Sequence, residues 1–148
     1  RTALRVQTND SVRLADFMIL WPSGEFPLAQ SGVAGIDVRS TDGDHANTHS
    51  VVERICVYGA DRGLVFTNCT NFMMLCCTVL MSQTYGVVVT TVAGPMYFQN
   101  AADWLIQGNT FYSGSAFNQY AAAIYIQGCA GRVIGNKIQP ASGGVTPR

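Results

Sequence analysis

The sequence predicts an all-β protein, a parallel solenoid of about five coils with loop insertions, and three observations lead to this prediction. A two-part apolar phrase recurs along the chain. Within each phrase the apolar residues follow the two-residue period of a β-strand, and helical periodicity is absent. Gly, Asn, Ser and Thr, which favour turns, separate the predicted strands.

The two parts of the phrase can be placed along the chain. The first part is a small residue followed by an apolar, a variable and an apolar residue, at residues 3–6, 35–38, 63–66, 86–89 and 123–126. The second part is a pair of short apolar runs, at residues 12–19, 52–57, 72–79, 104–111 and 133–138. Four insertions make the spacing of the copies uneven, at residues 20–34, 40–49, 94–102 and 113–122. Without these insertions, each unit has the length and turn content of one coil of a parallel solenoid.

Charge supports this alignment of the coils. Equivalent positions in successive coils should lie roughly 4.8 Å apart. The alignment places Arg5 over Asp37 and Asp16 over Arg54, so that two opposite-charge pairs face each other. We expect surface ion pairs of small energetic value at these four residues.

Composition limits the possible functions. Nine basic residues balance nine acidic ones, so no field over the whole domain favours nucleic acid or an anionic membrane. No stretch approaches the roughly 18 apolar residues of a membrane span, and the start RTALRVQTND lacks the apolar region of a secretion signal. We expect neither nucleic-acid binding nor membrane insertion.

The cysteines form no metal-ligand pattern; they are Cys56, Cys69, Cys76, Cys77 and Cys129. Adjacent side chains of a strand point to opposite faces, so Cys76 and Cys77 would not chelate one ion. We expect cysteines that fill the core as small apolar residues, no metal and no cofactor. In the middle coil the residues predicted to point inward are Leu64, Phe66, Phe72, Met74, Cys77 and Val79.

The five small-apolar-variable-apolar phrases, together with GNTF at residues 108–111 and GNKI at residues 135–138, carry a family resemblance. The chain resembles the right-handed parallel β-helix superfamily, the pectate-lyase-like fold of pectin-degrading enzymes, alginate epimerases and bacteriophage tailspikes. Among its members, the long insertions, free cysteines and missing secretion signal look most like a tailspike or related virion protein. The resemblance implies one β-helix domain over residues 1–148, part of a longer chain, with a loose tail at residues 139–148. It also implies a homotrimer located in a virion or outside the cell.

The resemblance implies action on polysaccharides, either by paired carboxylates or by a base with β-elimination. Asp42, Asp44, His45 and His49 lie in the insertion at residues 40–49, the densest group of ionisable residues. They could act as general acid and base, or Asp42, Asp44 and Asn47 could bind a hard cation, or the segment could be a solvated turn.

A second candidate site is a column of polar residues at one turn of successive coils, namely Ser11, His49, Asn71 and Asp103. Stacked turn residues of this kind often form a ladder of side-chain hydrogen bonds. Alternatively, His49 and Asp103 could flank Asn71 as a catalytic pair about 10 Å apart, which is wide for an inverting hydrolase.

Aromatic residues gather in or beside the insertions, at Trp21, Phe26, Tyr97, Phe98, Tyr112, Phe117 and Tyr120. They could stack on sugar rings, or they could pack over a coil or against another subunit. One outward column changes from charged to apolar along the solenoid, through Arg5, Asp37, Val65, Val88 and Tyr125. Because an exposed apolar strip needs covering by a loop or a second chain, this column favours a homo-oligomer.

These observations favour a tailspike-like virion protein that binds, and in its enzymatic form also depolymerises, a bacterial surface polysaccharide. The candidate catalytic residues are Asp42, Asp44, His49 and Asp103, and the candidate carbohydrate-binding residues are Trp21, Tyr97, Tyr112 and Tyr120. If the protein is an enzyme, a glycoside hydrolase fits better than a lyase, because uronate chemistry needs clustered lysines and arginines. The alternatives are a non-catalytic virion stem and a secreted polysaccharide lyase or epimerase.

Overall fold

The computed structural model describes residues 2–8, 10–20, 33–40, 47–82, 84–90, 103–113, 122–127 and 131–139. Within these residues the chain forms seventeen strands and no helix, and every strand pairing is parallel. None of the described segments is a helix long and apolar enough to span a membrane. The predicted all-β class and the parallel pairing are therefore confirmed.

The strands form three five-stranded sheets and one two-stranded sheet. Sheet A contains β1 (Leu4–Gln7), β4 (Ala34–Arg39), β8 (Arg62–Thr67), β12 (Tyr85–Thr90) and β15 (Ala122–Ile126). Sheet B contains β2 (Arg13–Ala15), β6 (Val51–Glu53), β10 (Met73–Leu75), β13 (Trp104–Gln107) and β16 (Gly131–Ile134). Sheet C contains β3 (Met18–Leu20), β7 (Cys56–Tyr58), β11 (Thr78–Ser82), β14 (Thr110–Ser113) and β17 (Lys137–Gln139). Sheet D pairs β5 (Asn47–Thr48) with β9 (Cys69–Thr70).

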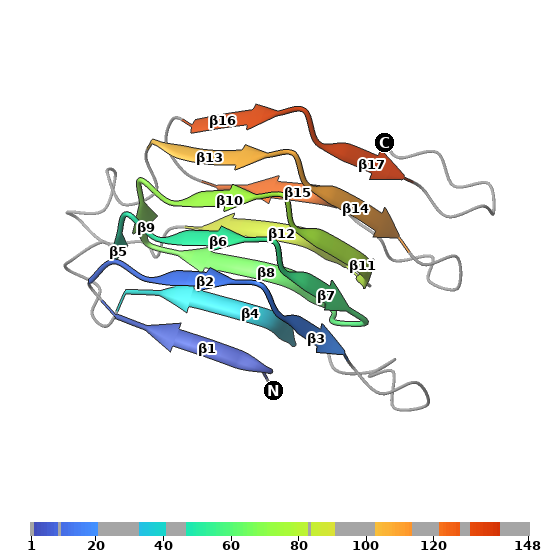
Figure 1. Cartoon of the computed structure of the whole chain (residues 1–148), viewed down its shortest axis with the longest axis horizontal. Coiled ribbons are helices and arrows are strands. Elements are labelled where there is room, and N and C mark those ends of the chain that lie inside the picture. The colour runs from blue at the N-terminus through green and yellow to red at the C-terminus, as the bar shows by residue number, and fades with distance from the viewer. Residues whose placement is uncertain are drawn as a thin grey trace.

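Along the chain the strands visit sheets A, B and C in the same order five times. We call each set of three strands a pass, so that pass 1 is β1, β2 and β3 and pass 5 is β15, β16 and β17. In each of these sheets, neighbouring strands belong to consecutive passes. Figure 1 shows the result as layers that run in chain order from the blue β1 to the red β16 and β17.

The register of the sheets agrees with the predicted alignment of the phrases. In sheet A, the first apolar residue of each phrase pairs with the next, through Leu4, Ile36, Leu64, Val87 and Ile124. In sheet C the corresponding column is Ile19, Val57, Val79, Phe111 and Ile138. The strand register, including the pairing of Arg5 with Asp37, could thus be predicted from repetition and charge.

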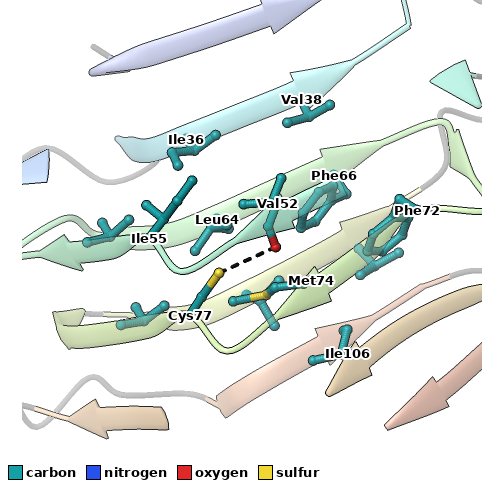
Figure 2. Packing of buried hydrophobic residues seen from close by; sticks show 14 of the residues in the cluster. Ile36, Val38, Val52, Ile55, Leu64, Phe66, Phe72, Met74, Cys77 and Ile106 are labelled. Atoms are coloured by element: carbon teal, nitrogen blue, oxygen red, sulfur yellow. Dashed lines mark hydrogen bonds between the residues drawn. The ribbon is translucent and has the colours of Figure 1, made fainter. Parts of the chain in front are cut away.

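The core lies between the sheets and consists of these inward columns. All six residues that the sequence predicts to point inward in the middle coil are at most 1% exposed. The Phe66 and Phe72 rings stack with centroids 4.1 Å apart and planes at 11°. Figure 2 shows Ile36, Leu64 and Met74 entering one shared interior from β4, β8 and β10.

The glycine that begins the second, third and fourth of the five sheet A phrases has a steric cause. A Cβ at Gly63 would collide with the Gly86 carbonyl oxygen of the next pass and with the Val79 side chain. Gly35 and Gly86 meet the same obstacles, one against Val57 and Gly63, the other against Phe111 and Ala123. Sheet C side chains therefore press directly on the sheet A backbone at this column.

Between sheets B and C the chain turns at a residue with left-handed backbone, in the column Asp16, Arg54, Cys76, Gly108 and Gly135, with φ from 50° to 66°. Each N–H of the first four donates to the carbonyl of the next pass, for example Arg54 N–H to Leu75 O at 3.0 Å. Glycine adopts this conformation at no steric cost, whereas Arg54 and Cys76 adopt it with strain.

The residue after each left-handed position points into the core and forms a column of rungs: Phe17, Ile55, Cys77, Asn109 and Asn136. The Oδ1 atom of Asn109 accepts from the Cys77 N–H at 2.8 Å, and that of Asn136 accepts from the Asn109 N–H at 2.9 Å. Each asparagine amide donates to a carbonyl one pass back, Asn109 to Met74 O at 3.0 Å and Asn136 to Ile106 O at 2.8 Å. The upper rungs thus satisfy buried backbone groups that the turn would otherwise leave unpaired.

The Cys77 thiol also donates a hydrogen bond to a carbonyl one pass back. Its Sγ donates to Val52 O at 3.5 Å, the carbonyl one pass back that corresponds to Met74 O and Ile106 O (Figure 2). Burial raises the pKa of the Cys77 thiol to about 11 and that of Cys69 to about 12. Both thiols therefore stay protonated near neutral pH and remain weak donors in the core.

The prediction that the cysteines fill the core is correct only in part. Cys69 and Cys77 are buried, Cys56 is half-buried, and these three with Cys76 carry free thiols. Cys76 is exposed, because the left-handed turn directs it outward while its neighbour Cys77 points inward. Cys129 lies outside the described residues.

Candidate functional site

The outer face of sheet C carries two parallel columns of side chains. Along each of its strands the second residue points into the core, as the burial of Val57, Val79 and Phe111 shows, so the residues on either side of it point outward. One outward column is Met18, Cys56, Thr78, Thr110 and Lys137. The other is Leu20, Tyr58, Leu80, Tyr112 and Gln139. We call these two columns together the sheet C face.

Tyr58 and Tyr112 are the aromatic residues of this face. Both are half-buried, and Leu80 lies between them in the same column. Two strand spacings of roughly 4.8 Å place equivalent atoms of the two tyrosines about 10 Å apart along the column. The neighbouring column supplies the hydroxyls of Thr78 and Thr110 on the strands that carry Leu80 and Tyr112. The face therefore offers two aromatic side chains at a regular interval, with hydroxyl groups beside them.

Of the predicted carbohydrate-binding residues, Tyr112 lies on the sheet C face. Trp21, Tyr97 and Tyr120 lie outside the described residues. Sequence reasoning missed Tyr58, because it searched the insertions for aromatic residues and did not follow the outward column of the repeated strands. The signal was present, since Tyr58 follows the inward Val57 just as Tyr112 follows Phe111.

Two of the predicted catalytic residues, His49 and Asp103, lie in the polar column at the turn before sheet B. Both are exposed, and Asn71 separates them, in agreement with the predicted alignment. Three of the four residues of this column have a left-handed backbone, with φ of 58° at His49, 53° at Asn71 and 56° at Asp103. Asp42 and Asp44, like His45, lie outside the described residues.

The side-chain ladder expected at Ser11, His49, Asn71 and Asp103 is not formed. The structure records no hydrogen bond among these four described side chains. Backbone bonds join the passes here instead, such as the His49 N–H to Thr70 O at 3.2 Å. Asn, Asp and His are the side-chain types that tolerate left-handed backbone best after glycine, which explains the polar column.

The Arg5–Asp37 pair differs from the expected surface ion pair, because Asp37 is only 2% exposed. Arg5 Nε lies 3.1 Å from one carboxylate oxygen and Arg39 Nε lies 3.1 Å from the other. Two guanidinium groups thus bind the buried carboxylate of Asp37. Burying this ion pair costs more desolvation free energy than forming a pair at the surface does.

The outward column that contains Asp37 is also covered, since Val65 and Val88 are 8% and 4% exposed within the single chain. With Ala34 they form a small second cluster against Tyr85. The prediction that this strip is covered holds for Val65 and Val88, whereas Tyr125 of the same column is 40% exposed. A second chain is not needed to bury Val65 and Val88, so these two residues do not by themselves argue for an oligomer.

The predicted Asp16–Arg54 pair forms at the turn between sheets B and C. Arg54 binds both oxygens of Asp16, at 2.6 and 2.8 Å, and reaches Glu53 at 2.5 Å, while Arg13 Nε lies 2.6 Å from Glu53. The hydrogen bond from Arg54 holds the pKa of Asp16 below its ordinary 3.8, and that from Arg13 holds the pKa of Glu53 below 4.5. These carboxylates stay ionised at neutral pH and cannot serve as proton donors.

Comparisons with known proteins found no match that could be set beside this geometry. No family model matches the chain, and no curated protein or solved structure matches it. Within the described residues, no group of three or more His, Cys, Asp or Glu side chains could hold a metal ion.

Proposed function

We propose that the chain is a right-handed parallel β-helix in which each pass is one coil, and that its sheet C face binds an extended bacterial surface polysaccharide. In this proposal it belongs to a tailspike-like virion protein. The consistent A, B, C order of the strands and their in-register parallel pairing support the helical fold. The homotrimer and the virion location rest on the resemblance described above.

One observation carries the binding proposal, the pair of tyrosines on a rigid column of the sheet C face. Sugar rings present apolar C–H faces that stack on aromatic rings, while their hydroxyls need hydrogen-bond partners. Two strand spacings are close to the length of two consecutive residues of an extended glycan. Tyr58 and Tyr112 could therefore contact alternate sugars of one chain, with Thr78 and Thr110 available to the hydroxyls between them.

We propose binding rather than cleavage for the described part of the chain. Asp16, Asp37 and Glu53 are each paired with arginine. His49 and Asp103 remain candidates for acid and base, but two strand spacings, about 10 Å, separate their positions. That separation exceeds the range for either class of glycosidase.

The test is binding of the 148-residue protein to purified bacterial surface polysaccharides, first on an array and then by calorimetry with oligosaccharides of the best ligand. Loss of one aromatic stacking contact of about 0.5–1.5 kcal/mol predicts a roughly twofold to thirteenfold weaker affinity for Tyr58→Ala and for Tyr112→Ala. Tyr125→Ala is the matched control, because Tyr125 is a 40% exposed tyrosine of sheet A.

Binding that survives both sheet C substitutions, or that is lost equally in Tyr125→Ala, would rule out the sheet C face. Reducing ends and unsaturated products are monitored in the same samples. Binding without either product separates a glycan-binding module from a hydrolase and from a lyase, whereas binding to no glycan at all favours a structural stem.

A further inference from the structure

The outer face of sheet B carries apolar side chains that the chain leaves uncovered in its middle passes. Along each strand a buried residue alternates with an outward one, as the burial of Val52 and Met74 shows. Met73 points outward and is 42% exposed, although β6 and β13 flank its strand β10 on both sides. Three outward residues beside it are half-buried, namely Val51, Leu75 and Leu105.

We call the outward residues of sheet B, together with those of the turns at its two ends, the sheet B face. Figure 1 shows its strands stacked in one row from β2 to β16. In passes 2, 3 and 4 the first column of this face is His49, Asn71 and Asp103, and the second is Val51, Met73 and Leu105. The third column is Glu53, Leu75 and Gln107, and the fourth is Arg54, Cys76 and Gly108. Pass 3 is thus apolar at its centre, and polar groups of different kinds lie in passes 2 and 4.

A second copy can be laid on this face by a two-fold axis that runs along β10. Such an axis exchanges pass 2 of one copy with pass 4 of the other and leaves pass 3 facing itself. Sheets packed face to face lie about 10 Å apart, so side chains at facing positions meet. The His49 imidazole, an N–H donor, then faces the Asp103 carboxylate of the second copy, and symmetry makes this contact twice.

The other facing positions also match. Val51 faces Leu105, so the apolar centre is continuous across the two copies. The long side chain of Arg54 faces Gly108, which has no side chain. Met73 lies on the axis and meets its own copy. Charge and size are therefore complementary when the two stacks of passes run in opposite directions.

The other two-fold arrangement, with the axis along the stack of passes, lacks this match. It keeps equal passes level and sets the apolar Val51 against the Glu53 carboxylate, which already binds Arg13. It also brings His49 toward Arg54, so that two donors face each other. Covering an ionised carboxylate with an apolar side chain costs desolvation free energy that no new contact offsets.

Two features make the favoured contact weak. Arg13 of pass 1 faces Arg132 of pass 5, and both are exposed, so that water and salt screen their repulsion at the rim. The face is also small, because five strands and the six residues 49–54 span roughly 20 Å by 20 Å, or about 400 Å² per copy. Stable complexes bury about 800 Å² per partner.

We propose that the sheet B face joins two copies of this chain in a weak dimer whose two-fold axis lies at pass 3, with reciprocal contacts between His49 and Asp103. The dimer does not rest on the glycan-binding proposal, because it leaves the sheet C face open. It is also separate from the homotrimer that the resemblance implies, to which no contact residues are assigned.

Sedimentation equilibrium of the 148-residue protein up to about 1 mM measures the association, and we expect a reversible monomer–dimer equilibrium. Met73→Lys should weaken the dimer at least about tenfold, because two ammonium groups would meet on the axis. Met18→Lys is the matched control, since Met18 is 58% exposed on sheet C, and it should leave the equilibrium unchanged.

One variant should strengthen the dimer, a result that misfolding cannot produce. Arg132→Glu replaces the like charge that faces Arg13 with an opposite one, at two symmetric places. We expect an affinity about threefold or more above that of the wild type, since each exposed ion pair contributes a small gain.

Exchange of the polar pair tests the position of the axis. His49→Asp sets two carboxylates face to face and should weaken the dimer about threefold or more. The double exchange, His49→Asp with Asp103→His, rebuilds the pair and should return the affinity to within about twofold of the wild type. Both residue types tolerate the left-handed backbone of this column, so the passes themselves stay intact.

The exposed thiol of Cys76 gives a second readout, because Cys76 lies on the axis and faces its own copy. In a Cys129→Ser background, a short bis-maleimide should join two chains, and Cys76→Ser should remove the product. A protein that stays monomeric at about 1 mM, a double exchange that restores nothing, or a missing Cys76 cross-link overturns the proposal. A trimer that Met73→Lys abolishes would make the sheet B face a three-fold contact and would overturn it as well.

Discussion

Asn109 connects three passes through one buried side chain. It is 0% exposed, its Oδ1 accepts from the Cys77 N–H, and its amide donates to Met74 O and to Oδ1 of Asn136. A carboxamide fits this position because it is donor and acceptor at once. Cys77, one pass earlier, can donate but offers only a weak acceptor, and Ile55 before it does neither.

We therefore expect Asn109→Ala to lower the free energy of unfolding by about 2–4 kcal/mol. The substitution leaves the Cys77 N–H buried without a partner, at roughly 1–3 kcal/mol, and removes the hydrogen bonds to Met74 O and to Oδ1 of Asn136, at about 0.5–1.5 kcal/mol each. Urea unfolding followed by far-UV circular dichroism measures the change. Asn136→Ala is the control, because Asn136 is only half-buried and should cost less. An equal or smaller loss for Asn109→Ala would contradict the role of this rung.

The two Gly-Asn pairs can be recognised in the sequence, but the hydrogen bonds that their asparagine side chains form cannot be predicted from it. The same rung holds Phe17, Ile55 and Cys77 in the earlier passes, so residue type does not repeat along it. The left-handed backbone of the preceding residue decides which way the rung points. Glycine predicts the left-handed conformation at Gly108 and Gly135, but the residue types at Arg54 and Cys76 do not predict it.

At the scale of strands, sheet C side chains lie directly against the sheet A backbone where a glycine begins a sheet A phrase. Gly63 lies against the Gly86 carbonyl and the Val79 side chain, both in the middle of the core. The missing side chain of Gly63 allows sheets A and C to lie this close. Neither the Gly86 carbonyl nor the Val79 side chain can make room for a Cβ without a shift of its strand.

Gly63→Ala should consequently destabilise the protein by about 1–3 kcal/mol, the usual cost of overpacking a core. Thermal unfolding measures the effect. Gly135→Ala provides the comparison, because a Cβ there meets nothing within 4 Å and the change costs only the left-handed backbone term. That term is about 1 kcal/mol. Wild-type stability in Gly63→Ala would show that sheets A and C can separate.

Repetition made the long strands predictable, and its absence hid the short ones. The columns of sheets A, B and C could be aligned because five copies share one pattern. Sheet D joins only Asn47–Thr48 to Cys69–Thr70, and residues 40–49 were assigned to an insertion. Two residues are too few to show a two-residue period, so β5 and β9 could not be recognised from the sequence.

At the scale of the whole molecule, each described pass of sheets A, B and C pairs only with its neighbours in these sheets. Stability should then be distributed along the stack, as it is in repeat proteins. Pass 3 has neighbours on both sides, and Leu64, Met74 and Val79 within it are at most 1% exposed. Pass 5 has a described neighbour on one side only.

Hydrogen exchange should follow this distribution. We expect the amides of β8, β10 and β11 to exchange slowest and those of β1–β3 and β15–β17 to exchange fastest, because the end passes can open without disturbing the centre. Mass spectrometry of peptic fragments measures the protection of each pass. Uniform protection from end to end would mean that the stack opens as one cooperative unit.

The candidate site on the sheet C face could be recognised only from the arrangement of the whole molecule. Tyr58 and Tyr112 are far apart in the sequence and share no motif, and their common column depends on the register of sheet C. The burial of Asp37 and Val65 was equally unpredictable, because the period of a strand shows which face a residue is on and not whether that face is covered. Ionisable residues in a loop can be recognised directly from the sequence, whereas a surface formed by equivalent positions of successive passes requires the strand register.

The pairing of each pass with the next has a consequence for how such a chain can change over generations. Duplication or loss of one complete pass leaves every column intact, so that the molecule can lengthen or shorten in whole steps. Deletion of a single residue inside a strand reverses which side chains face the interior for the rest of that strand. We therefore expect this fold to accept insertions and deletions of a whole pass more readily than deletions of single residues within the strands.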